Sequence, residues 1–161
     1  MQASAIAFFE TLEKTSWAVG IRQSAWLYPA LEIVHILGIV MLVGAAFMFD
    51  LRLLGYSKSL QVSGLADHLL PWSRRGLLLV IPSGILLFLT NAQALGTDAV
   101  FWLKLALILI AALNVLFFHN YTFKKHGASV SGQLPFAARI SAVVSIVVWI
   151  GVIACGRLLA Y

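Results

Sequence analysis

Long apolar stretches separated by short polar ones dominate the pattern of this chain. Four of them are long enough to be membrane-spanning helices, because a helix needs about 20 apolar residues to cross the hydrocarbon of a bilayer. The predicted spans cover residues 29–54, 75–92, 101–121 and 136–159. Gly55 suits the end of the first span, and a kink is expected in the second span at Pro82.

The N-terminal segment has a different pattern, in which one helix face is apolar and the other is charged. Residues 1–27 are therefore expected to form a helix that lies on the membrane surface. Residues 61–72 show a similar pattern before the second span. The sequence thus predicts an all-α fold, an integral membrane four-helix bundle over residues 28–161 with an N-terminal amphipathic interfacial helix.

The composition supports this class of protein. Hydrophobic residues make up 61% of the chain and charged residues 11%, and the mean hydropathy is +0.97. In soluble domains, roughly 45–50% of the residues are hydrophobic and about 25% are charged. The net charge of +5 comes from residues that flank the spans, so we expect lipid contacts and no nucleic-acid binding. The single Cys155 excludes an internal disulfide and a multi-cysteine metal site.

The distribution of basic residues predicts the orientation in a bacterial inner membrane. One side carries Arg52, Lys58, Arg74, Arg75, Lys124, Lys125 and Arg139, and the other carries Lys14, Arg22, Lys104 and Arg157. The side with more basic residues is expected in the cytoplasm. Both termini are therefore expected in the periplasm.

Ionisable side chains inside the spans are candidate functional residues, because a charge at the bilayer centre costs about 2.5–3.5 kcal/mol on insertion scales. Glu32 and His35 share a face in the outer half of the first span, and Gly38 continues that face. A small residue there admits a neighbouring helix or a flat cofactor. Arg157 ends the last span at a similar depth, so it can pair with Glu32 or complete a ligand site with His35. Lys104 is expected to extend toward the interface.

Two further histidines lie toward the inner side. His119 ends the third span and His68 precedes the second, and with His126 they are candidates for an inner metal or haem site. The alternative is that they are interfacial or solvated residues. His35 and His119 differ in depth by roughly 18 Å, so they cannot both ligate one haem within a chain. A di-iron site is excluded because the chain has one Glu-x-x-His pair.

Other polar residues are expected to have structural roles. Asp50 and Arg52 are expected to join a charge network at the inner surface. Asn114, deep in the third span, is expected to bond to another helix, and Ser141 and Ser145 lie on one stripe of the fourth.

These residues together resemble an uncharacterised family of small four-helix bacterial inner-membrane proteins. The similar positions are Trp26, Pro29, Glu32, His35, Gly44, the run Asp50 to Gly55, Gly84, Phe101, Lys104, Asn114, His119 and the end from Gly156 to Tyr161. The chain is also loosely similar to the membrane domains of CopD-type copper-resistance proteins and to b-type cytochrome anchors. Both use histidines in helical bundles. This chain lacks their paired histidines at one depth and has no Met-rich tract.

These observations leave three alternative functions for the protein. The first is a membrane subunit of a redox system that binds haem b or a quinone through His35, Glu32 and Arg157, with His119 and His68 at an inner site. The second is a non-catalytic accessory subunit of a larger membrane complex or homo-oligomer. The third is transport of a metal ion or small solute. The candidate metal ligands are His35, His119 and His68, and copper is an alternative to haem b as the bound group. The sequence contains no catalytic motif of a known enzyme class.

Overall fold

The computed structural model describes residues 2–56, 61–119 and 136–159, and these contain helices and no strand. The helices are α1 (Gln2–Glu13), α2 (Ser16–Gln23), α3 (Leu27–Leu54), α4 (Val62–Thr90), α5 (Ala92–Thr97), α6 (Ala99–Phe117) and α8 (Phe136–Leu158). Of these, α3, α4, α6 and α8 are long and apolar enough to cross a membrane. The expected all-helical fold with four long apolar helices is confirmed at this level.

The ends of the long helices follow local chemistry. Gly55 adopts a φ of 103°, a left-handed conformation that glycine tolerates best. The N–H groups of Gly55 and Tyr56 then donate to carbonyls of the last turn of α3, each at 3.1 Å. The helix therefore ends where the sequence predicts. In contrast, α4 begins at Val62 and continues through Pro82, so residues 61–72 are part of a long helix and not a separate surface helix.

Glycines bring α3 and α4 into backbone contact. A Cβ added at Gly76 of α4 would lie 2.7 Å from the carbonyl oxygen of Gly38 and 2.7 Å from the nitrogen of Leu42, both in α3. A Cβ at Gly38 would meet the carbonyl oxygen of Gly76 at 3.0 Å. Small residues permit this close approach. The glycine face of α3 is therefore covered by a helix, which leaves no room there for a flat cofactor.

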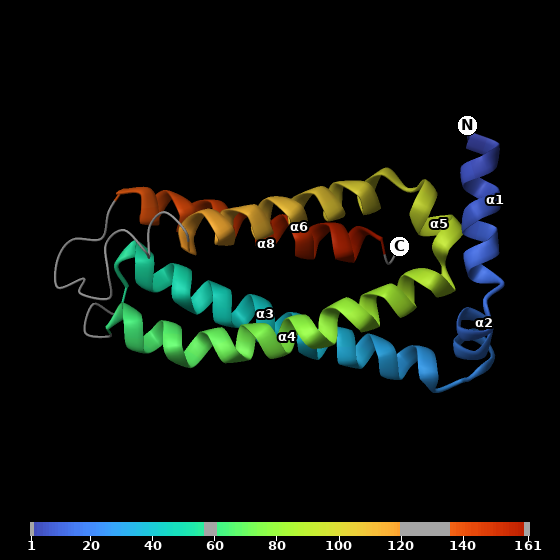
Figure 1. Ribbon diagram of the computed structural model, residues 1–161, viewed down its shortest axis with the longest axis horizontal. Helices are drawn as coiled ribbons and strands as arrows, with labels where there is room; N and C mark the ends of the chain where they lie inside the picture. Colours follow the sequence, from blue (N-terminus) through green and yellow to red (C-terminus); the bar gives the residue numbers. More distant parts are fainter. Residues whose placement is uncertain (1, 57–60, 120–135, 160–161) are drawn as a thin grey trace.

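The second pair of long helices is α6 and α8, which pack through Ala111, Val148 and Val152 with Leu107, Val144 and Trp149 around them. The two pairs meet where α8 packs on α3, around Leu53, Ala138 and Ala142. Within the described residues, the backbones of α4 and α6 do not come into contact. The packing order is thus α4, α3, α8, α6, with the two pairs visible side by side in Figure 1.

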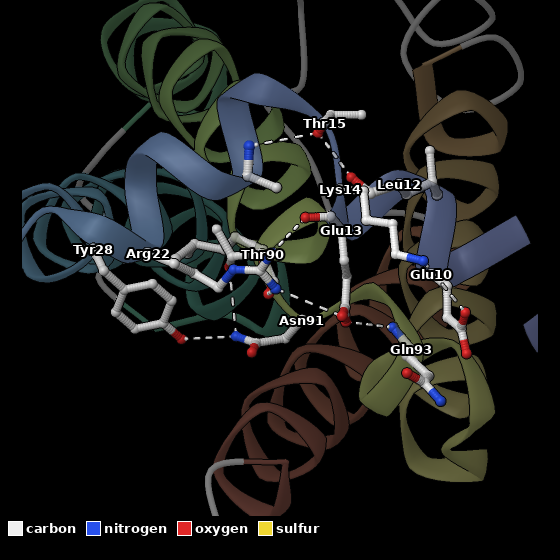
Figure 2. A network of polar contacts seen from close by, with 12 residues as sticks. Glu10, Leu12, Glu13, Lys14, Thr15, Arg22, Tyr28, Thr90, Asn91 and Gln93 are labelled. Carbon is white, nitrogen blue, oxygen red and sulfur yellow. Dashed lines mark hydrogen bonds and ion pairs between the residues drawn. The ribbon is translucent and has the colours of Figure 1, made fainter. Parts of the chain in front are cut away.

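The N-terminal helices α1 and α2 lie across one end of the long helices, and the C-terminal end of α8 is found at the same end (Figure 1). Polar contacts hold them there (Figure 2). Arg22 donates to the carbonyl oxygen of Thr90 at 3.2 Å, and Glu13 accepts from the backbone N–H of Gln93 at 2.8 Å. The ring of Phe9 in α1 packs against Gly96 of α5, in the space that a side chain at Gly96 would fill. The segment is therefore a two-helix arm that is docked on α4 and α5.

Candidate functional site

His35 of α3 is held by a serine of α4. Its Nδ1 lies 2.9 Å from Oγ of the buried Ser83. The Ser83 hydroxyl donates its proton to the carbonyl oxygen of Leu79 and approaches that of Val80 at 3.3 Å. Because this proton is already used, Ser83 accepts from His35, and Nδ1 carries the hydrogen. The other ring nitrogen, Nε2, then keeps its lone pair when the imidazole is neutral.

Gly84 makes room for the imidazole. A Cβ at this position would lie 3.0 Å from Cε1 of His35 and 3.6 Å from Nδ1. Any larger residue would push the ring away from Ser83. The sequence Ser83-Gly84 therefore supplies both the hydrogen-bond acceptor and the space that orient this histidine.

Lys104 of α6 enters the same region from the second helix pair. Its side chain is half-buried and its Nζ would lie 3.6 Å from a Cβ built on Gly156 of α8. It interacts electrostatically with His35. No hydrogen bond or ion pair joins its ammonium to another described residue. Lys104 thus extends toward the last turn of α8, and its extension to the membrane interface stays a prediction.

Aromatic side chains close this region at the end nearest the arm. Phe88 of α4 stacks on Phe101 of α6, with ring centroids 5.1 Å apart and planes at 11°. Phe88 lies one helical turn beyond Gly84, and Phe101 one turn before Lys104. Phe9 of α1 packs edge-on against Phe88, with centroids 6.3 Å apart. These ring contacts connect α1, α4 and α6 within one helical turn of Gly84 and Lys104.

The other residues predicted for the outer site lie elsewhere. Glu32 is exposed and makes no hydrogen bond or ion pair with the described residues. Arg157 is also exposed, and the two do not form an ion pair. The physical reason is the rotation of side chains around the helix axis. A step of three residues turns the direction of a side chain by about 300°, which leaves it about 60° from the starting direction. His35 faces α4, and Glu32 is turned outward.

The inner site is not assembled within the described residues. His68 of α4 and His119, two residues beyond the end of α6, are both exposed. The described chain contains no group of three or more His, Cys, Asp or Glu side chains placed to hold a metal. His126 lies outside the described residues.

The structure thus retains His35 from the predicted set and adds Ser83, Gly84 and Lys104. A sequence signal for Lys104 exists, because it is a lone charge near the start of a strongly apolar helix. Ser83 lies 48 residues from His35, and nothing local in the sequence connects them.

Comparisons with other proteins give one match. No curated protein and no solved structure matches the chain, so the similarity to CopD-type proteins and to b-type cytochrome anchors finds no support. The match is to a family model that covers residues 8–161, almost the whole chain. The protein therefore belongs to a family of unknown function, DUF6644.

Proposed function

We propose that the protein is a multi-pass membrane protein of the bacterial inner membrane with both termini in the periplasm. Four long apolar helices support insertion, and so do large apolar side chains that face outward, such as Leu78 (73% exposed) and Leu109 (61% exposed). Both termini lie at one end (Figure 1). Arg52 lies near the C-terminal end of α3 and Arg139 near the N-terminal end of α8, so both are far from the end that holds the termini. Basic residues on that far side favour its placement in the cytoplasm. Lys58, Lys124 and Lys125 lie outside the described residues.

Within that membrane, we propose that the protein is a subunit of an electron-transfer system and holds a redox group between the two helix pairs. The observation that carries the proposal is the orientation of His35. Its Nδ1 is fixed on Ser83, so Nε2 is the nitrogen left to bind a ligand. Histidines that bind metals are commonly oriented in this way through their second nitrogen. Haem b fits this donor, and when bound it would supply one-electron transfer.

A quinone is the second candidate, and Lys104 favours it. The ammonium is half-buried, has no anionic partner among the described residues and interacts with His35. A quinone carbonyl oxygen would accept a hydrogen bond from it, and the hydroxyl of the reduced form would donate to Nε2 of His35. Glu32 and Arg157 do not contribute to this site in the structure.

The test is purification of the full chain in a mild detergent, followed by a visible spectrum and by solvent extraction of quinones. We expect a Soret band that His35→Ala removes, or a bound quinone that both His35→Ala and Lys104→Met deplete. His68→Ala is the matched control, because it removes an exposed histidine of α4. A wild-type protein that contains neither haem nor quinone would overturn the redox proposal and favour the accessory subunit.

A further inference from the structure

A buried carboxyl group lies outside the site described above. Asp50 is on α3, four residues before the end of that helix, and its side chain is turned into the protein. The residue is 6% exposed. The sequence predicts a surface charge network for Asp50 and its basic neighbours, and the burial of Asp50 shows that this prediction is wrong.

One oxygen of this carboxyl group is left without a partner. Asp50 shares a hydrogen bond with Ser145 of α8. Its Oδ2 is buried and has no hydrogen-bond partner among the described residues. A buried polar atom without a partner is rare in folded proteins and indicates either a ligand or a functional role.

One helical turn before Ser145, polar residues of α6 and α8 are paired with one another. Asn114 of α6 donates to the carbonyl oxygen of Ser141 at 2.9 Å, and the Ser141 hydroxyl donates back to Asn114 Oδ1 at 2.9 Å. Neither residue donates a hydrogen bond to Oδ2 of Asp50.

The described residues provide no counter-charge for Asp50. The ionisable groups on the elements around this end of α3 are Arg52 on α3, Asp67 and His68 on α4, Arg139 on α8 and, two residues beyond α6, His119. None of them forms an ion pair with Asp50, and Arg139 and His119 are exposed. An ionised carboxylate buried without a cation is strongly disfavoured in an apolar medium.

A proton satisfies this carboxyl group better than a metal ion does. Na⁺ or Ca²⁺ needs several oxygen ligands, and among the described residues Ser145 is the one side chain that bonds the Asp50 carboxyl group. A proton needs one oxygen, and Oδ2 is free to take it. We propose that Asp50 and Ser145 form a proton-binding site inside the bundle, in which Oδ2 of Asp50 carries an exchangeable proton.

The place of the site fits proton exchange with one side of the membrane. Asp50 lies roughly 6 Å along the helix axis from the end of α3, which is the end that we assign to the cytoplasm. Protonation adds H⁺ to Oδ2 and removes the negative charge, and release of the same proton restores it. No other reactant is required, so the proposal holds whether or not the outer site binds a redox group.

Infrared spectroscopy of the full chain in lipid vesicles tests this inference, because a protonated carboxylic acid has its own carbonyl stretch. We expect this band in the wild-type protein and its loss in Asp50→Asn. Glu32 is a second acid on α3, so Glu32→Gln removes any contribution from it and should leave the Asp50 band. Asp67→Asn, which removes an exposed acid of α4, is the matched control and should change nothing.

Three results would overturn the proposal. The first is a band that persists unchanged in Asp50→Asn. The second is a spectrum of Glu32→Gln that shows no band. The third is a band that appears only after Na⁺ is withdrawn, which would mean that a cation occupies the site. If Asp50→Asn fails to fold, Ser145→Ala keeps the acid and removes its hydrogen bond, so the band should shift in frequency; an unshifted band also contradicts the proposal.

Discussion

Substitution of Gly76 by alanine tests the contact that joins the first helix pair. The new Cβ would lie 2.7 Å from two backbone atoms of α3, whereas ordinary van der Waals contact begins near 3.4 Å. The helices must therefore separate locally by 3.4 − 2.7 = 0.7 Å, because backbone atoms of a helix cannot move aside singly. Overpacking of this kind costs about 1–3 kcal/mol, and the better helix propensity of alanine returns up to about 1 kcal/mol.

We therefore expect Gly76→Ala to lower the free energy of unfolding by about 1–2 kcal/mol. Equilibrium unfolding in mixed micelles, with helicity as the readout and increasing SDS as the denaturant, measures this change. Gly44→Ala is the matched control, since it lies on α3 with no atom within 4 Å of its added Cβ. It should be neutral or slightly stabilising.

The same separation has a consequence for the candidate site. His35 and Ser83 bridge the same two helices with a bond of 2.9 Å, and an added 0.7 Å would stretch it to 3.6 Å. A hydrogen bond at that distance is effectively lost. Gly76→Ala should therefore also reduce the haem or quinone content that depends on His35. If Gly76→Ala and Gly44→Ala unfold at the same SDS concentration, the close packing of α3 and α4 is refuted.

Other glycines and the contact between α6 and α8 can be tested in similar ways. Gly84→Ala places a methyl group 3.0 Å from the His35 ring, so redox-group content measured by spectrum and extraction should fall; an unchanged content contradicts the site. A double-mutant cycle of Asn114→Ala and Ser141→Ala should give a coupling of about 0.6 kcal/mol in SDS unfolding, and zero coupling argues against their bond. Gly96→Ala meets an α1 ring at 2.5 Å, so limited proteolysis should cleave the arm faster than in wild type. Equal cleavage rates would show that the arm is not docked there.

The cross-helix bond of Asn114 shows what a single sequence can predict about polar groups in apolar helices. An amide in such a helix must find a partner, because lipid offers none. The sequence therefore predicts that Asn114 bonds to another helix, and the structure confirms it with Ser141. The same reasoning is insufficient for Asp50, because its position near a helix end is compatible with both a surface network and a buried site.

The sequence by itself determined the four long apolar helices, because length and composition decide whether a segment suits a bilayer, and it determined the end of α3, because Gly55 tolerates a left-handed backbone. Only the tertiary structure decided which face of each helix is buried. A helix can rotate about its axis without any change in its sequence pattern when most of its side chains are apolar. The contact of Gly38 with Gly76 sets the rotation of α3 against α4, and this turns His35 inward and Glu32 outward.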